Sequence, residues 1–337
     1  MARRTLRSKR NIISDMQQLG WSKSVATQAF GKWGPSAISI LAQDPYVSFY
    51  LPARPPWSEA DAMARKAGLA ATSPERIAGA VRYTLLASTN DGHVFVPWEE
   101  LLQRVTRLIP LDNAEGWNQA VETLTHQREI YVVPSAQDSQ SPVYLYSLYR
   151  AERGVAQHLA RLVTAPSRIA LQAPGETELN KVEKQMKLRL ADLQRTAVSA
   201  SLTSKVVIIT GGPGTGKTTI LRGVLHLWGG RGAKIRLAAP TGRAAKRLSE
   251  STGRMALTLH RLLEYNVEDG GFLRNSTRPL KVDLMVVDEA SMIDTELMAA
   301  LLEALPSECH LLLVGDVDQL PAVGPGFVLH DLIESGL

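Results

Sequence analysis

The stretch that decides the fold runs from Lys205 to Thr219 and reads KVVIITGGPGTGKTT. Its first part, Val206–Ile209, is a run of β-branched residues with the composition and length of a buried strand. A glycine-rich loop follows directly, and the residues after Lys217 have the apolar spacing of a helix. The order of strand, G-x-x-x-x-G-K-[S/T] loop and helix is the context in which this motif binds phosphate. The sequence therefore predicts a nucleotide-binding P-loop.

Each part of the loop has a physical role in holding the phosphates of ATP. Glycines let the backbone wrap closely and turn its amides inward, and the N-terminus of the following helix adds partial positive charge. Lys217 is expected to reach the β and γ phosphates, and the hydroxyl of Thr218 is expected to ligate Mg²⁺. The loop and helix residues expected to bind the nucleotide are Gly212, Pro213, Gly214, Thr215, Gly216, Lys217, Thr218 and Thr219.

Two further apolar runs, at 284–287 and 311–314, end in polar side chains. Polar residues at the carboxyl ends of parallel strands lie at the rim where nucleotides bind. We expect Asp288 to join the Mg²⁺ shell and Glu289 to polarise the attacking water. Gln319, soon after the second run, is placed to touch the γ-phosphate or this water. The predicted catalytic set is Lys217, Thr218, Asp288, Glu289 and Gln319, with Thr218 and Asp288 as metal ligands.

The expected strands near 205, 235, 284 and 311 are separated by helices, which predicts a parallel α/β sheet of the RecA-like kind. The first 164 residues predict two other regions. Residues 11–66 have the spacing of short helices joined by tight turns, with Ser22 and Ser58 placed as caps. This pattern fits a helix-hairpin-helix region, whose turns contact DNA phosphates, or a small helical bundle without that function.

Residues 74–147 predict three helices and then a β-hairpin, which is winged-helix order. Pro166, Pro174 and Gly175 mark a linker after them. The chain is therefore expected to be multidomain, with an all-α helix-hairpin-helix and winged-helix-like region before the α/β domain. The expected boundaries are 1–72 for the helix-hairpin-helix-like domain, 73–164 for the winged-helix-like domain, 165–184 for the linker and 185–337 for the RecA-like domain.

Composition narrows the class of protein. A chain of 337 residues is long enough for two or three domains. No apolar stretch reaches the length of a membrane span and no secretory signal is present, so we expect a cytoplasmic protein. The single cysteine, Cys309, rules out an intrachain disulfide and multi-cysteine zinc sites. Residues 1–32 hold seven basic residues and one acid, which suits phosphate-backbone contact or a solvated terminus.

The motifs GGPGTGKT, APTGRAAKRL, TLHRLL, VVDEASMID and GDVDQLPAVGPG together resemble those of RecD-like helicases of superfamily 1, over about residues 190–330. The resemblance implies an ATP-dependent DNA helicase, with 5′ to 3′ polarity, that acts on single-stranded DNA and on junctions of single- and double-stranded DNA. It implies that Gln194 contacts adenine. It also implies DNA contacts for Pro240, Thr241, Arg243, Thr258 and His260. The front of the chain resembles the long RecD-like subfamily, which favours the helix-hairpin-helix interpretation.

The sequence departs from the family pattern in two places. Arg54-Pro55-Pro56-Trp57 stands where the second hairpin usually has a Gly-x-Gly-like turn. The chain ends at Leu337, soon after the motif GDVDQLPAVGPG. The resemblance therefore predicts a fragment without the second RecA-like domain, with slow hydrolysis and no unwinding. Two other hypotheses remain: a P-loop ATPase of another class, and a DNA-binding fragment with negligible turnover.

Overall fold

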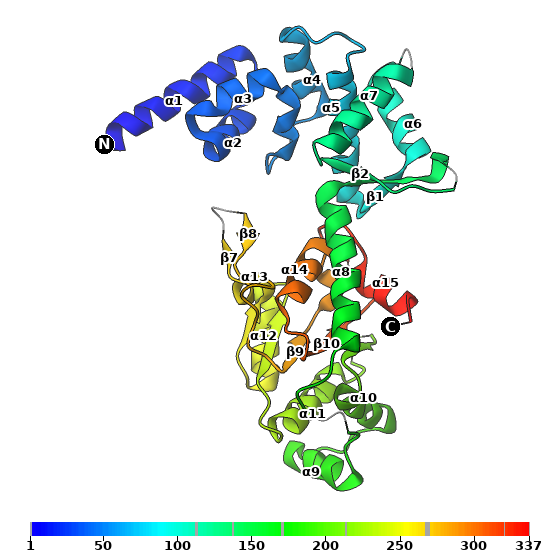
Figure 1. Cartoon of the computed structure of the whole chain (residues 1–337). Coiled ribbons are helices and arrows are strands. Elements are labelled where there is room, and N and C mark those ends of the chain that lie inside the picture. Colours follow the sequence, from blue (N-terminus) through cyan, green and yellow to red (C-terminus); the bar gives the residue numbers. More distant parts are fainter. Residues whose placement is uncertain are drawn as a thin grey trace. The chain divides into compact units, whose positions relative to one another are not determined.

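The computed structural model describes residues 2–111, 114–136, 138–169, 172–212, 214–266, 270–319 and 321–336. The chain forms two compact units, Met1–Ser147 and Leu148–Leu337, drawn in sequence colours in Figure 1. Each unit has a hydrophobic core of its own. Within the described ranges, no helix is both long and apolar enough to span a membrane.

The first part of the N-terminal unit is helical, as the sequence predicts. Ser22 caps the second helix by accepting a hydrogen bond from the Val25 amide, at 3.3 Å. The expected cap at Ser58 is wrong. The fourth helix begins at Trp57, because Pro56 already has the extended conformation of a cap residue and the Trp57 ring stacks on Tyr46. The helices are α1 (Ala2–Leu19), α2 (Lys23–Trp33), α3 (Ala37–Gln43) and α4 (Trp57–Lys66), with 3₁₀ turns at Gly34–Ser36 and Pro45–Tyr50.

The second part of this unit combines three helices with a small antiparallel sheet. The strand order is β1-β3-β2, so the first strand closes against the hairpin formed by the other two. Three helices followed by a hairpin is the order that the sequence predicts. The elements are α5 (Pro74–Ser88), β1 (Phe95–Pro97), α6 (Trp98–Leu108), α7 (Ala114–His126), β2 (Ile130–Val132) and β3 (Pro142–Leu145), with 3₁₀ turns at Thr89–Asp91 and Asp138–Gln140.

A buried arginine joins these two parts of the N-terminal unit. Arg82 on α5 donates hydrogen bonds to both carboxylate oxygens of Glu129, at 2.6 and 2.7 Å, and to Asp44, at 2.8 Å. The hydroxyl of Tyr50 donates to the same Glu129 carboxylate, at 2.7 Å. Charge-assisted bonds of this kind are stronger than neutral ones. A second buried ion pair, between Arg76 on α5 and Asp61 on α4, also joins the helical part to the part that contains the sheet.

The C-terminal unit is built on a five-stranded parallel sheet with the order β4-β10-β9-β5-β6. Four of these strands coincide with the predicted ones, and the edge strand β6 was not predicted. The strands are β4 (Val206–Thr210), β5 (Ile235–Ala239), β6 (Ala256–Thr258), β9 (Leu284–Val287) and β10 (His310–Gly315). A short hairpin, β7 (Tyr265–Asn266) and β8 (Gly271–Phe272), lies outside this sheet.

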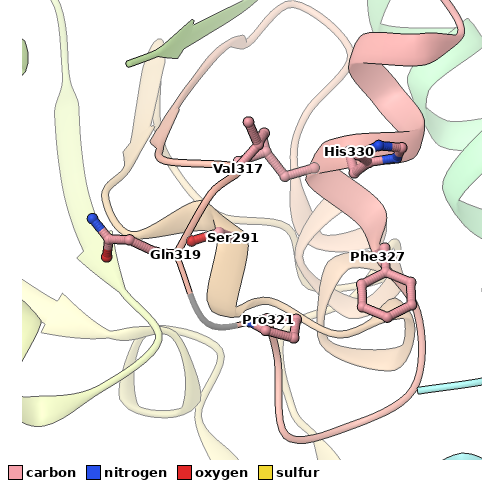
Figure 2. A pocket seen from close by; sticks show the side chains of 7 residues that line it. Ser291, Val317, Gln319, Pro321, Phe327 and His330 are labelled. Carbon is pink, nitrogen blue, oxygen red and sulfur yellow. The ribbon is translucent and has the colours of Figure 1, made fainter. Parts of the chain in front are cut away.

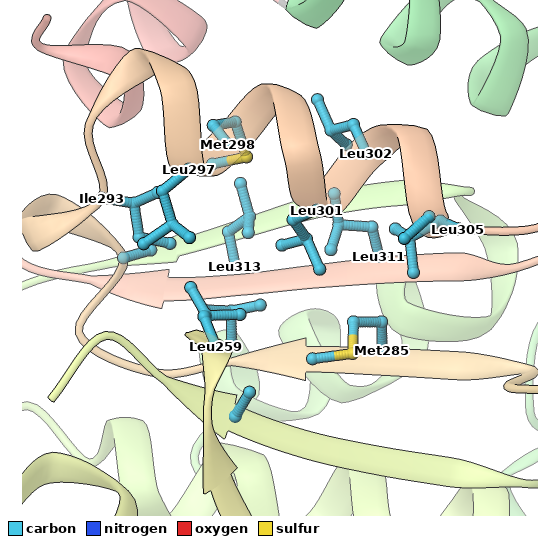
Figure 3. Close-up of a cluster of buried hydrophobic side chains, with 14 of the residues drawn as sticks. Leu259, Met285, Ile293, Leu297, Met298, Leu301, Leu302, Leu305, Leu311 and Leu313 are labelled. Atoms are coloured by element: carbon cyan, nitrogen blue, oxygen red, sulfur yellow. The ribbon is translucent and has the colours of Figure 1, made fainter. Parts of the chain in front are cut away.

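Helices cover both faces of the sheet, because alternate residues of each strand enter different cores. One core joins β9 and β10 to α8 and α14, and Figure 3 shows α14 lying over these two strands. The other core joins the opposite strand faces to α9, α10 and α11. The helices are α8 (Tyr146–Thr164), α9 (Glu176–Met186), α10 (Asp192–Thr203), α11 (Lys217–Gly229), α12 (Gly242–Thr252), α13 (Leu259–Leu262), α14 (Thr295–Ala304) and α15 (Val328–Glu334), with a 3₁₀ turn at Ala290–Met292.

The division between the units differs from the expected boundary at residue 164. Helix α8 buries Val155, Leu159 and Leu162 in the same core as α14 and the sheet, so it belongs to the C-terminal unit from Leu148 onward. The expected linker at 165–184 also contains the first nine residues of α9. The connection between folded elements therefore covers a shorter stretch than the proline and glycine residues suggested.

Candidate nucleotide site and DNA-side rim

The predicted nucleotide residues meet at one edge of the sheet because three neighbouring strands end there. In the parallel register, Gly315 of β10 pairs with Thr210 of β4, and Leu313 pairs with Val287 of β9. The loop after β4, the Asp288-Glu289 pair after β9 and the loop after β10 therefore start at the same edge of the sheet, with the acid pair two residues earlier in the register. The predicted strand positions thus bring the expected phosphate, metal and sensing residues to one rim.

The loop between β4 and α11 has the backbone that its glycines allow. Gly214 and Gly216 have φ values of 78° and 90°, the left-handed region that other residues rarely adopt. Gly216 directly precedes α11, so the amides of the first helical turn point into the loop. Thr218 is exposed and Thr219 is half-buried in that turn. Pro213 lies outside the described residues.

The ammonium of Lys217 is held inside the loop. It donates hydrogen bonds to the carbonyls of Gly211 and, at 3.1 Å, of Gly212. Its nitrogen is also 3.9 Å from the Oδ2 atom of the buried Asp316. A cation at the centre of a loop of inward-facing amides is well placed to meet phosphate oxygens.

Gln194 reaches this loop from a separate helix. Its Oε1 accepts a hydrogen bond from the Ala191 amide at the start of α10, at 3.1 Å. Its Nε2 lies 2.4 Å from the point where a Cβ on Gly216 would stand, so only a glycine allows this contact. Next to it, the side chain of Leu193 is 84 % exposed. The structure thus brings Gln194 to the P-loop.

The two acids after β9 have different surroundings. Burial raises the pKa of Asp288, whose Oδ1 accepts a hydrogen bond from the Glu289 amide at 3.0 Å. Glu289 has a φ of 54°, a left-handed conformation that costs a non-glycine residue about 1–2 kcal/mol. Backbone strain of this kind is concentrated at functional sites. Close by, the hydroxyl of Ser291 is buried without a hydrogen-bond partner among the described residues.

Gln319 is positioned by an acid that the sequence did not single out. The amide Nε2 of Gln319 donates to Asp316 Oδ2, at 3.0 Å, and Asp316 also accepts from the Asp318 amide, at 3.2 Å. Asp316 is 2 % exposed and faces Lys217, so one carboxylate connects the P-loop cation to the sensing residue. Its signal in the sequence is its place directly after the glycine that ends β10.

A small pocket of about 30 Å³ opens beside Gln319. Figure 2 shows Ser291 near its centre, with Gln319 on one side and Phe327 and His330 on the other. Phe327 is 46 % exposed although it is a large apolar side chain. The loop after β10 therefore contributes both a polar side chain and an apolar surface to this rim.

The residues expected to touch DNA lie at the ends of two adjacent strands. Ala239 of β5 pairs with Thr258 of β6, so Pro240 and Leu259 leave the sheet side by side. The Thr241 and Thr258 hydroxyls cap α12 and α13, accepting hydrogen bonds from backbone amides at 3.2 Å each. Arg243 is exposed in the first turn of α12. Both threonines thus have a structural role, while the charge of Arg243 faces solvent.

His260 belongs to an aromatic group that the sequence analysis did not identify. Its ring lies 5.6 Å from the rings of both Tyr265 and Phe272, which themselves are 5.1 Å apart across the β7–β8 hairpin. Tyr265 is 43 % exposed. The available signal was a pair of aromatic residues, Tyr265 and Phe272, with Gly270 and Gly271 between them in the sequence.

Comparison with known proteins places the chain in a family. Residues 5–95 match the family described as the ATP-dependent RecD2 DNA helicase HHH domain, and residues 194–325 match a family described as an AAA domain. The ATP-dependent RecD2 DNA helicase of Deinococcus radiodurans is 33 % identical over 334 residues, 97 % of this chain and 46 % of the relative. The chain belongs to the RecD-like family of superfamily 1.

Other RecD-like relatives match mainly the C-terminal unit. The RecBCD enzyme subunit RecD of Mycolicibacterium smegmatis is 41 % identical over 165 residues, which is 42 % of this chain and 30 % of that protein. The corresponding subunit of Haemophilus influenzae is 36 % identical over 219 residues, 57 % of this chain and 34 % of that protein. This RecD-like chain therefore spans less than half of the length of these relatives. The N-terminal match begins inside α1 and contains α2 to α4, so the helical region is the family's helix-hairpin-helix region.

Proposed function

We propose that this RecD-like chain is the nucleotide-binding and DNA-gripping part of an ATP-dependent DNA helicase. The observation that carries the proposal is that the P-loop lysine, two acids and a glutamine from three strand ends lie at one rim, directly beside the strand ends that present Arg243 and His260. A motor needs a coupling free energy between its nucleotide and DNA contacts, and neighbouring strand ends offer a direct physical route for it. The similarity to a relative named as an ATP-dependent DNA helicase supports the same function.

In this proposal each side chain at the rim has one task in ATP hydrolysis. Lys217 neutralises the β and γ phosphates, and Gln194 recognises the adenine. Glu289 orients the attacking water, and Gln319 senses the γ-phosphate through its bond to Asp316. Because Asp316 faces both Lys217 and Gln319, loss of the γ-phosphate would change the charge balance that holds the glutamine.

The proposed metal is Mg²⁺, held by Thr218 and Asp288. The described residues contain no group of three His, Cys, Asp or Glu side chains that could hold a metal. Mg²⁺ in nucleotide sites keeps water and phosphate ligands and uses only one or two carboxylates, so such a group is not required. Asp288 is a desolvated carboxylate with a raised pKa, and a nearby cation would stabilise its charged form. When bound, Mg²⁺ would neutralise charge on the β and γ phosphates.

The proposed nucleic-acid substrate is single-stranded DNA, including its junctions with duplex, with 5′ to 3′ movement. Arg243 offers an exposed guanidinium to the backbone, beside Pro240 and Thr241. His260 and the partly exposed Tyr265 ring offer faces on which bases stack, and such stacking contributes about 1–3 kcal/mol per base. Binding through a positive charge on the DNA backbone and through aromatic faces for the bases does not depend on the base sequence.

Nucleotide and DNA titrations of Lys217→Ala test the proposal. Removing the lysine deletes charge-assisted phosphate contacts of about 1.5–3 kcal/mol, which is a roughly 10- to 150-fold loss of affinity for a fluorescent ATP analogue with Mg²⁺. Lys234→Ala, an exposed lysine of the same unit, is the matched control and should bind as the wild type does. Equal affinities for Lys217→Ala and wild type would remove the nucleotide assignment.

The same proteins separate a helicase from a P-loop ATPase of another class. We expect the wild type to bind a fluorescein-labelled (dT)20 strand, with an affinity that changes when a non-hydrolysable ATP analogue is added. In Lys217→Ala the nucleotide should no longer alter DNA affinity. A protein that binds the analogue but shows no affinity for (dT)20 in either state would favour the other ATPase class.

A further inference from the structure

A second polar cavity, of about 300 Å³, lies between the later turns of α11 and the end of α12. It is lined by Arg222, Leu225 and His226 from α11 and by residues 251–254 from the end of α12. His226 is nine residues beyond Lys217, about 13 Å further along the helix axis. The cavity is therefore separate from the P-loop, and none of the residues assigned to nucleotide or DNA lines it.

The cavity concentrates positive charge without compensation. Arg222, His226 and Arg254 line it, no acid does, and no ion pair or side-chain hydrogen bond involves these three side chains within the described structure. Burial lowers the pKa of His226, and the charges of Arg222 and Arg254 lower it further. By contrast, Arg231, which follows the C-cap of the same helix, is neutralised by Glu178, at 3.1 Å. An anion in the cavity would relieve this repulsion.

Two features indicate that Arg254 is positioned rather than merely exposed. Its Nη2 atom lies 2.8 Å from the point where a Cβ on Gly229 would stand, so the glycine makes room for the guanidinium. Gly229 is the last residue of α11, so the guanidinium lies at the carbonyl end of this helix. The carbonyl ends of α11 and α12 also favour nearby cations. However, none of the three side chains donates a described hydrogen bond to those carbonyls, so helix capping does not account for the group.

We propose that this basic cavity, defined by Arg222, His226 and Arg254, binds a phosphate oxyanion, supplied by a nucleic-acid backbone or by a free phosphate compound. Guanidinium groups match the geometry of phosphate oxygens and hold them with paired hydrogen bonds. Arg243 and Arg247 are exposed on α12, four residues apart and so on one side of the helix. They form a line of charge from the DNA-side rim toward the cavity, a path along which a strand gripped at that rim could reach it.

The test compares Arg222→Ala/Arg254→Ala with the control Arg150→Ala/Lys181→Ala, which removes two charges from exposed positions on α8 and α9. If the ligand is a nucleic-acid backbone, the slope of log K against log salt for (dT)20 becomes shallower by about 1.4 in the cavity variant, at roughly 0.7 for each phosphate that is no longer neutralised. The control slope stays nearer to that of the wild type. Binding of the fluorescent ATP analogue is unchanged in both proteins.

Inorganic pyrophosphate provides the second arm, read by the NMR titration of the His226 ring, which reports this cavity and not the P-loop. If the ligand is a free phosphate compound, pyrophosphate raises the pKa of His226 in the wild type and not in Arg222→Ala/Arg254→Ala. Gly229→Ala keeps every charge but displaces Arg254, and should weaken whichever response is found without lowering the melting temperature. A (dT)20 slope equal to that of the control, together with a His226 titration that ignores pyrophosphate in the wild type, would overturn the proposal.

Discussion

His310 shows how strongly the environment sets the properties of one side chain in this fold. The residue is 2 % exposed at the start of β10, with its ring edge-on to Trp228 at 4.7 Å. Its Nδ1 faces the Ser204 carbonyl at 3.0 Å, so Nδ1 carries the proton and Nε2 accepts from the Ser167 hydroxyl at 2.7 Å. Burial lowers the pKa of His310 to about 4, and the charge of Lys205 lowers it further. The folded protein therefore holds a neutral imidazole.

This lowered pKa predicts a loss of stability in mild acid. Below the ordinary histidine pKa of 6.5 the unfolded chain binds a proton that the folded chain does not bind until about pH 4. The free energy of unfolding should therefore fall as pH drops from about 6.5 to 4, by up to about 3 kcal/mol from this residue. Above pH 7 the residue contributes no pH dependence.

Urea unfolding at pH 7.5, 6.0 and 5.0 measures the effect. His310→Gln removes the titrating group and should lose less stability between pH 7.5 and 5.0 than the wild type does. His330→Gln changes an exposed histidine of the same unit and serves as the control, which should follow the wild type. Identical pH dependence in His310→Gln and wild type would show that the acid sensitivity arises elsewhere.

Among the elements, α8 is the one whose role the sequence least revealed. Its apolar residues recur at helical spacing, so an amphipathic helix was predictable, but the spacing does not say which core the apolar face enters. The structure places that face on α14 and the sheet. The proline at 166 resembled the start of a linker, although the preceding helix was already part of the C-terminal unit.

Two neighbouring residues of α8 give a matched test of this packing. Leu162 is fully buried and Val163 is 44 % exposed. Leu162→Ala should lower the free energy of unfolding of the C-terminal unit by about 2–5 kcal/mol, because it leaves a cavity in the core. Val163→Ala should change it by less than about 0.5 kcal/mol. The unfolding transition of this unit is the one that nucleotide shifts to higher temperature, and the fall in its melting temperature reports the destabilisation. Equal effects of the two substitutions would contradict the assignment of α8.

The elements that the sequence did predict are those whose signals are local. The strand, loop and helix at 205–229 carry their pattern within one stretch, and the acids at 288 and 289 follow directly from a buried run. The edge strand β6 is three residues long, too short to show a period. The pairing of Asp316 with Gln319 and Lys217 depends on side-chain positions brought together only by the folded sheet. The sheet order depends on long-range pairing in the same way.

At the scale of the whole molecule, charge is distributed unevenly between the ends of the chain. Residues 1–32 have a net charge of +6, and the rest of the chain has −1. Much of this excess lies in α1, where Lys9 and Arg10 are exposed. The Lys9 ammonium sits 5.8 Å above the ring of Phe30, an interaction that leaves its charge available to solvent. In a helix-hairpin-helix region, such positive charge can contact DNA phosphates without reading bases.

The last prediction tests whether this helix contributes to DNA affinity. Deleting residues 2–10 removes five basic residues but keeps Met16, the fully buried residue that anchors α1 in its core. Each phosphate of single-stranded DNA that the protein no longer neutralises reduces the steepness of log K against log salt by about 0.7, so the slope for (dT)20 should become shallower by up to about 3.5.

A second protein with the same five residues changed to glutamine separates charge from helix length. If α1 acts through charge, both proteins show the same shallower slope and the same affinity at high salt, where the electrostatic term is screened. An unchanged slope in both would identify residues 2–10 as a solvated terminus, and a change in the deletion alone would assign the effect to the helix rather than to its charges.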